Sequence, residues 1–318
     1  AICVSGYELE VTMSWRTRLL GIVFVASATI TSPVLADYPE KPVTLICWSS
    51  AGSGHDLMAR MIAKVGEKYL GEPIVVVNKQ GGSGRVAMSY VLNQKPDGHV
   101  LLTNTRSMIL RFREANARLS IDDFKYISRV VRDPFVIIVN EDSPFRTIDE
   151  LIEHARNNPG KVNIGGYSIQ SVDESLVRDV EAAVGIELNY IPYRGGKEPV
   201  VAVLGGHIDV AIANPSEMIT SYLAGNLRAL AVATEERFPP FEDVPTLTER
   251  GYPVAPDYWR GIMAAKDVPD AVVEKWSEVL GQVVADPEFM EFLENANMYD
   301  GYLPSDEFTK LVMRQTGQ

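Results

Sequence analysis

Short apolar, β-rich runs alternate with segments of helical periodicity along most of the chain, and this alternation constrains the fold more than any other feature. In the first half, the order strand, helix, strand, helix, strand is predicted over residues 43–47, 57–69, 74–77, 86–94 and 99–103. Spacing of the apolar residues distinguishes the helices from the strands. Strands that alternate with helices favour right-handed crossovers, so we expect an α/β fold with a mostly parallel sheet.

The same alternation resumes in the second half of the chain. Strands are expected at 135–139, 162–165, 188–191, 210–213, 227–233 and 261–265, and helices at 148–155, 171–184, 271–284, 287–296 and from 305 onward. The proline-rich, charged stretch 235–256 is predicted to be a connection. A chain of 318 residues, 46% of them hydrophobic, is long enough for two domains with separate cores.

Residues 1–36 are predicted to be a leader with a signal peptide. Met13 is the expected start, two arginines follow it, and the apolar run 19–30 is too short to span a bilayer, which needs roughly 20 residues. A small-residue cleavage site ends at Ala36, so we expect cleavage there and export of the remaining protein.

Composition argues against several classes of function. The formal net charge of −12 disfavours nucleic acid and anionic membranes as partners. Removal of the leader would leave Cys47 as the single cysteine, and its apolar neighbours predict a small buried side chain. The four histidines lie far apart, and no metal-binding spacing or nucleophile elbow is present. We therefore expect no metal, no cofactor and no catalytic residues.

Four loops carry unusual sequence, and each follows a predicted strand or precedes a predicted helix. Ligands of α/β proteins bind at loops in such positions. The first, 49–56, is glycine-rich and is either an anion cradle at a helix N-terminus or a tight strand–helix turn. The second, 78–85, formally matches a dinucleotide fingerprint, but no acidic residue ends the next strand, so we expect it to line a cleft. The third is 103–107, and the fourth begins with a capping box at Ser171.

With further landmarks, these loops resemble the periplasmic solute receptors of tripartite tricarboxylate transporters, the Bug family. The resemblance covers essentially the whole chain after the leader, and its landmarks are 51–56, 77–84, 96–98, 192–196, 204–210, 227–232 and 243–246. It implies a two-lobed periplasmic binding protein fold (type II-like) with the ligand cleft between the lobes. We place lobe 1 at 37–134 plus about 255–318, and lobe 2 at 135–254.

The resemblance also implies a function. A monomeric periplasmic receptor would bind a small solute, most simply a carboxylate, and deliver it to membrane permease subunits. Carried over residue by residue, the implied ligand contacts are Ser49, Gly54, His55, Asp56, Gly82, Ser83, Gly84, Arg85, Thr105, Arg106, Ser168, Ser171 and Asn214.

Departures from the family pattern leave the chemical identity of the solute open. Trp48 precedes Ser49 where the family usually has Pro followed by Phe or Tyr, and the second-lobe loop reads Ser-Ile-Gln-Ser over 168–171 instead of Gly-x-Gly-Ser. Asp173 and Glu174 would repel an anion if they faced the cleft, so a neutral or amine-bearing solute is the alternative to a carboxylate. Two other functions stay open as well: a sensing module that signals to a partner protein, and a secreted enzyme.

Overall fold

The first sheet of the protein combines strands from both ends of the chain. In the computed structural model, which describes residues 38–113 and 118–317, its strand order is β11-β4-β10-β3-β1-β2. The strands are β1 (Val43–Cys47), β2 (Ile74–Asn78), β3 (Val100–Thr105), β4 (Phe124–Arg132), β10 (Trp259–Ala265) and β11 (Tyr299–Leu303). Its helices are α1 (Gly54–Leu70), α2 (Arg85–Leu92), α3 (Arg106–Leu110), α8 (Asp270–Ala285), α9 (Pro287–Ala296) and α10 (Ser305–Thr316). Short 3₁₀ turns lie at η2 (Gly82–Gly84), η3 (Arg111–Arg113) and η4 (Ile121–Asp123).

The second sheet is built from the middle of the chain, in the order β7-β6-β8-β5-β9. Its strands are β5 (Val136–Asn140), β6 (Asn163–Tyr167), β7 (Asn189–Tyr193), β8 (Val210–Ala213) and β9 (Leu227–Val232), and its helices are α4 (Ile148–Asn157), α5 (Val172–Val184), α6 (Lys197–Leu204) and α7 (Pro215–Leu223). Side chains alternate between the two faces of a strand. Ile137 and Val139 of β5 accordingly join one buried cluster, while Val136 and Ile138 join another on the opposite face.

Local sequence signals account for the helix boundaries. The Ser53 side chain caps α1 by accepting the Asp56 amide, and the helix ends at Gly71 with φ of 85°. The Ser171 side chain caps α5 in the same way, accepting the amide of Glu174. The helices predicted at 148–155, 271–284 and 287–296 are confirmed within a residue or two.

The prediction of a mostly parallel sheet is wrong for the half of the first sheet that lies beyond β3. β1 pairs in parallel with β2 and β3, but β10 is antiparallel to β3 and β4, and β11 is antiparallel to β4. Strand β4 was not predicted from the sequence, because Lys125, Arg129 and Arg132 interrupt its apolar pattern. Helices α3, α6 and α7 and strand β11 were also missed, since each is short.

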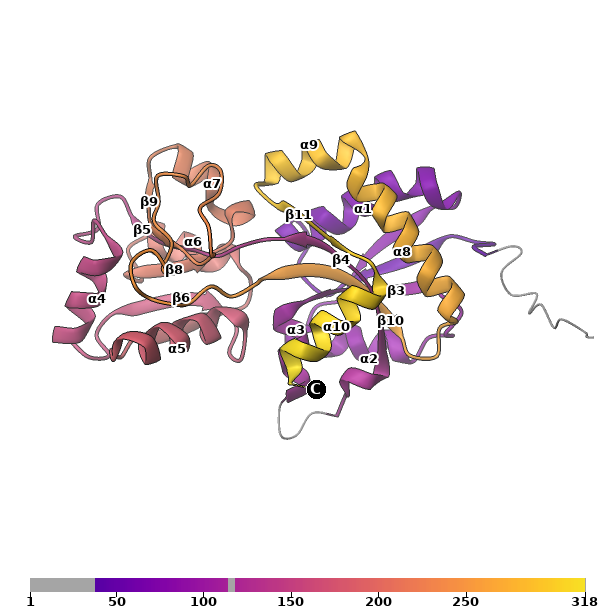
Figure 1. Cartoon of the computed structure of the whole chain (residues 1–318), viewed down its shortest axis with the longest axis horizontal. Coiled ribbons are helices and arrows are strands. Elements are labelled where there is room, and N and C mark those ends of the chain that lie inside the picture. The colour runs from indigo at the N-terminus through magenta and orange to yellow at the C-terminus, as the bar shows by residue number, and fades with distance from the viewer. Residues whose placement is uncertain (1–37, 114–117, 318) are drawn as a thin grey trace, which may run out of the picture. The chain divides into compact units, whose positions relative to one another are not determined.

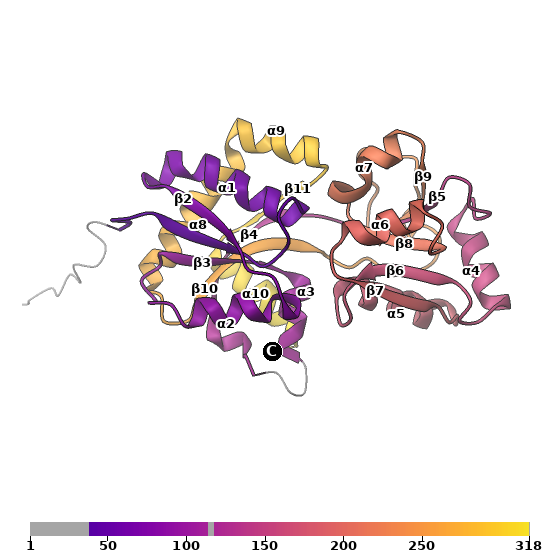
Figure 2. The ribbon, with the colours of Figure 1, turned by 180° about the vertical axis from the view of Figure 1, so that it is seen from behind.

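Residues 37–318 form one compact unit, within which two segments connect the sheets. Figures 1 and 2 show β4 and the stretch that leads into β10 running between the two sheets. Arg129 and Arg132 of β4 both pair with Asp257, which precedes β10, at 3.2 and 3.1 Å.

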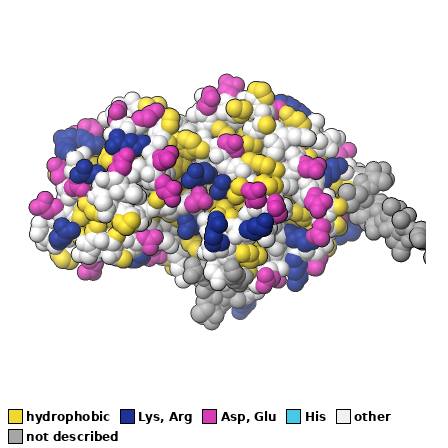
Figure 3. Space-filling view, viewed as in Figure 1, with side chains coloured by type: hydrophobic (Ala, Val, Ile, Leu, Met, Phe, Trp, Pro, Cys, Tyr) yellow, Lys and Arg dark blue, Asp and Glu magenta, His cyan; other side chains and the backbone are white. Residues whose placement is uncertain are grey.

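Figure 3 shows acidic and basic side chains interspersed over the visible face.

Two further expectations concern the leader and the boundaries of the lobes. The predicted leader, its start at Met13 and its cleavage site after Ala36 lie outside the described residues. The lobe boundaries near 134 and 255 stay a prediction. Within the described part of the chain, no helix is long and apolar enough to cross a membrane.

Candidate functional site

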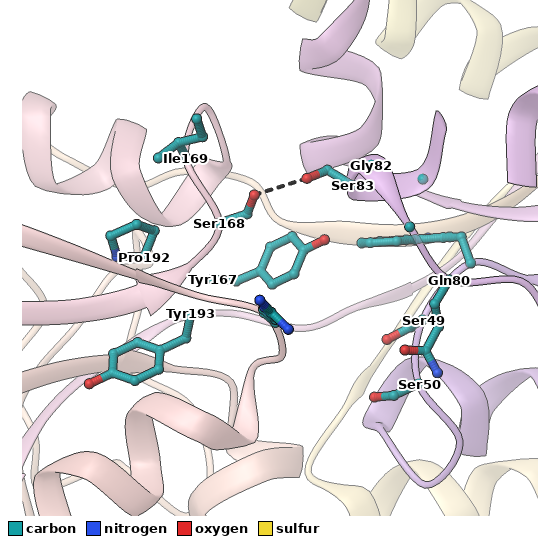
Figure 4. A pocket seen from close by; sticks show the side chains of 14 residues that line it. Ser49, Ser50, Gln80, Gly82, Ser83, Tyr167, Ser168, Ile169, Pro192 and Tyr193 are labelled. Carbon is teal, nitrogen blue, oxygen red and sulfur yellow. Dashed lines mark hydrogen bonds between the residues drawn. The ribbon is translucent and has the colours of Figure 1, made fainter. Parts of the chain in front are cut away.

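A cavity of about 610 Å³ lies where loops from both sheets meet. Parallel strands β1 and β2 of the first sheet and β6 and β7 of the second end at its walls, as expected for an α/β ligand site. Figure 4 shows Ser49, Ser50 and Gln80 on the side of the first lobe, facing Tyr167 and Ser168. The lining residues are Trp48, Ser49, Ser50, Gln80, Gly81, Gly82, Ser83, Gly84, Tyr167, Ser168, Ile169, Pro192, Tyr193 and Arg194.

Asp56 stabilises the β1–α1 loop, which carries the lining residues Ser49 and Ser50. Its buried carboxylate accepts hydrogen bonds from the Gly52 amide at 2.8 Å, from Asn78 Nδ2 at 2.8 Å and from Arg60 Nε at 2.9 Å. Burial acts to raise the pKa of Asp56, but the hydrogen bonds outweigh it and lower the pKa. Asp56 therefore stays ionised and holds the β1–α1 loop, and it does not line the cavity.

His55 and Gly54 lie deeper than the cavity wall. His55 is buried, its Nε2 lies 2.7 Å from Thr103 Oγ1, and burial together with the nearby Arg260 charge holds its pKa well below the usual value. The imidazole is therefore neutral, and its ring packs 5.5 Å from the ring of Trp48. A Cβ on Gly54 would lie 2.6 Å from Ser216 Oγ at the start of α7, so only glycine allows this close approach.

The second loop contributes backbone rather than charge. Gly81, Gly82, Ser83 and Gly84 all have positive φ, at 127°, 56°, 52° and 95°. Loops of this kind form concavities that bind anions through backbone N–H groups, and here the Gly84 N–H donates within the loop to the Gly81 carbonyl at 3.2 Å. Arg85 begins α2, is exposed, and does not line the cavity.

Asp173 and Glu174 do not face the cavity. Asp173 is buried and accepts the Tyr167 amide at 2.9 Å, and burial raises its pKa to about 7. Glu174 accepts the Gln170 amide at 2.6 Å and pairs with Arg178 at 3.3 Å. Both carboxyl groups thus stabilise the loop that carries them. Neither faces the cavity, so the repulsion of an anion that the sequence suggested is not expected.

Four of the sequence-predicted contacts serve the framework. Ser171 Oγ donates to Ser168 O at 3.0 Å, and Thr105 caps α3 by accepting the Met108 amide at 3.3 Å. Arg106 Nη1 donates to Asp257 O at 3.2 Å and borders a separate depression. Asn214 Nδ2 donates to two carbonyl groups of the connection between β4 and β5, at 2.6 and 3.1 Å.

The structure thus divides the predicted contacts into two groups. Those that line the cavity are Ser49, Gly82, Ser83, Gly84 and Ser168. Those that lie behind or beside it are Gly54, His55, Asp56, Arg85, Thr105, Arg106, Ser171 and Asn214. The lining residues that the predicted contacts did not include are Trp48, Ser50, Gln80, Gly81, Tyr167, Ile169 and 192–194. The position of 192–194 at the end of a predicted strand was an available signal.

Direct hydrogen bonds join the lobes at the edges of the cavity. Ser83 Oγ lies 2.9 Å from Ser168 Oγ, as the dashed line in Figure 4 shows. Arg111, which is buried, donates to Ser168 Oγ at 3.1 Å, to Gln170 Oε1 at 3.2 Å and to the carbonyl of Ile169. Ser168 and Gln170 have φ of 45° and 53°, a strained conformation for residues other than glycine, so these contacts hold an unfavourable loop in place.

A buried ion pair lies below the cavity. Arg260 of β10 pairs with Asp133, which follows β4, and both are almost inaccessible to solvent. Burial acts to raise the pKa of Asp133, and the Arg260 charge opposes that rise. Because each partner belongs to a different segment running between the sheets, the pair ties the two segments together.

Known proteins match this chain over most of its length. A family model described as tripartite tricarboxylate transporter family receptor matches residues 58–318. BugT of Bordetella pertussis is 31% identical over 265 residues, which cover 81% of each protein. A TctC solute binding protein from Polaromonas is 29% identical with a TM-score of 0.71, over 88% of this chain and 96% of that one. The periplasmic binding protein BugD is 28% identical with a TM-score of 0.79, over the same shares.

These matches confirm the family expected from the sequence, together with its two-lobed fold and its role in solute binding. Matches to a family model and to a relative at 31% identity each cover well over half of the chain. The chain therefore belongs to the receptor family of the tripartite tricarboxylate transporters.

Proposed function

We propose that this receptor captures a small organic solute bearing a carboxylate in the cavity between its lobes and delivers it to membrane permease subunits. The observation that carries the proposal is the polar lining of the cavity. It consists of serine hydroxyls, the Gln80 amide, the backbone of the glycine-rich loop and one guanidinium, that of Arg194, with no carboxylate among the lining residues. Such a lining attracts an anion and offers an amine no counter-charge.

Binding is expected to act through closure. A solute that contacts both the glycine-rich loop of one lobe and Ser168 of the other binds the closed form more tightly than the open form. The closed form is stabilised by that difference in binding free energy. We infer that the solute leaves chemically unchanged. The nucleophilic side chains in the lining are serine and tyrosine hydroxyls, and no histidine or carboxylate lines the cavity to act as their base.

The remaining expectations are part of the same proposal. We propose lobe boundaries near 134 and 255, cleavage after Ala36, and a monomeric periplasmic receptor. The strand composition of the two sheets supports the boundaries, because the first sheet takes its strands from 43–132 and 259–303 and the second from 136–232. Family membership supports the location and the permease partner.

Thermal unfolding in the presence of candidate solutes tests the proposal. A solute at 100 times its Kd should stabilise the protein by about 2.7 kcal/mol, which raises the Tm by several degrees. We expect shifts with carboxylates and none with the matching amines. Shifts with amines alone would refute the assignment of a carboxylate.

Deletion of the gene tests delivery separately. Transport predicts that cells lose uptake of the solute that stabilises the protein. Unchanged uptake would favour the sensing module instead.

A further inference from the structure

We infer that the solute is a monocarboxylate with an apolar ring, an inference that rests on the proposed function and narrows it. The first step is the charge of the cavity. Arg194 is the only lining residue with a formal charge. Within the described part of the chain, its exposed guanidinium pairs with no carboxylate, whereas its backbone N–H donates to Glu198 at 3.1 Å.

The other positive groups near the cavity do not line it. Arg111 is bonded to the 168–170 loop, Arg260 is paired with Asp133, and His55 is neutral. Lys197 donates to the carbonyl of Gly52 at 3.3 Å. None of these groups lines the cavity, so Arg194 is the one charged side chain that a solute in the cavity can contact directly. A second carboxylate in the cavity would be desolvated without a direct counter-ion, which is costly.

The second step is the apolar part of the wall. Trp48 follows β1 in the first lobe, Tyr167 ends β6 in the second, and their ring centroids lie 5.8 Å apart. Figure 4 shows Tyr167 reaching from the second lobe toward the Gly82 loop, with Ile169 and Pro192 on its own side. Together these residues form an aromatic and aliphatic surface that spans both lobes. Aromatic rings bury large areas and pack well against other flat groups.

The third step is an unused donor in that surface. The indole Nε1 of Trp48 is buried and donates to no acceptor in the described chain. Buried donors in folded proteins are nearly always satisfied. We assign a carboxylate oxygen of the solute as its acceptor, because other atoms of Trp48 line the cavity beside Ser49 and the 80–84 loop. This places the carboxylate between Trp48 of the first lobe and Arg194 of the second, and the apolar body against Tyr167.

Isothermal titration of the purified protein with six probes tests each step. Benzoate and cyclohexanecarboxylate carry one carboxylate and a ring. Acetate lacks the ring, benzamide lacks the charge, isophthalate adds a second carboxylate to the ring, and citrate carries three without a ring. We expect at least one ring-bearing monocarboxylate to bind tenfold or more tightly than acetate, benzamide, isophthalate and citrate.

The outcomes separate this inference from the proposed function. Tighter binding of isophthalate, citrate or acetate than of benzoate and cyclohexanecarboxylate overturns the inference and leaves a carboxylate receptor. Binding of benzamide alone overturns both. Failure of both ring-bearing monocarboxylates to bind also overturns the inference, and the citrate and isophthalate titrations then decide whether the proposed function survives.

Two variants locate the contacts. Arg194→Gln should weaken the ring-bearing monocarboxylate by about tenfold or more and leave benzamide unchanged, because only the charged partner is lost. Arg314→Gln is the matched control, since Arg314 is exposed on α10 and does not line the cavity. Trp48→Phe keeps an aromatic ring but removes the donor, and should weaken binding several-fold with the Tm of the solute-free protein little changed. Equal affinities for Arg194→Gln and Arg314→Gln would overturn the role given to Arg194.

Discussion

Arg111 offers the sharpest test of how this receptor closes. It belongs to the first lobe and donates to Ser168 Oγ, Gln170 Oε1 and the Ile169 carbonyl of the second, so these bonds exist only while the lobes are together. Arg111→Ala removes these bonds while every residue that lines the cavity keeps its own side chain. We expect weaker binding of every solute by the same factor.

The size of that factor follows from the bonds. Each hydrogen bond to the charged guanidinium contributes about 1.5 kcal/mol at the lower end of the usual range, and ordering the long side chain costs up to about 2 kcal/mol. The closed state should therefore lose about 2 to 3 kcal/mol. If the solute binds only the closed form, which is the minor form of the free protein, affinity falls by roughly 30- to 150-fold.

Titration calorimetry with two solutes of different affinity measures this loss. Small-angle scattering at a solute concentration that closes the parent should show a more open particle for the variant. Arg111→Lys keeps the charge but reaches fewer acceptors, so its affinity should be intermediate. Arg314→Ala serves as the matched control. Affinities within twofold of the parent would refute the closing role, and a changed ratio between the two solutes would mean that Arg111 touches the solute.

Three further predictions concern the framework of the site. Arg260→Met should lower the free energy of unfolding by about 3 to 5 kcal/mol because it leaves Asp133 buried without its partner, and adding Asp133→Leu should recover most of the loss in urea titrations. The folded-state pKa of Asp173, about 7, lies above the ordinary aspartate value of 3.8, so its contribution to stability is complete below about pH 4 and is lost as pH rises toward 7. Asp173→Asn should therefore raise the Tm at pH 7.5 and match the parent near pH 4, and the same Tm difference at both pH values would contradict this. Asp56→Ala should cost about 1 to 3 kcal/mol at pH 7, because it strands the Gly52 and Asn78 donors, and a change below 0.5 kcal/mol in chemical denaturation would count against its role in holding the loop.

The sequence by itself determined the elements whose signals are local. The apolar run 43–47 predicts β1, helical spacing predicts most of α1, and Gly71 marks the end of that helix. Glycines at 81, 82 and 84 occupy left-handed positions, as their clustering between a strand and a helix suggests. Family resemblance then indicated two lobes, because the order of these loops extends along the whole chain.

Only the tertiary structure decided which polar side chains face the solute. A pattern reports the period and burial of one segment but not the partner supplied by another. Thr103 turns His55 inward, the Tyr167 amide engages Asp173, and Arg111 meets a loop that lies 57 residues away from it in the chain. The directions of β4 and β10 were likewise set by their passage between the sheets, because strand polarity depends on which neighbour a strand meets and not on its own residues.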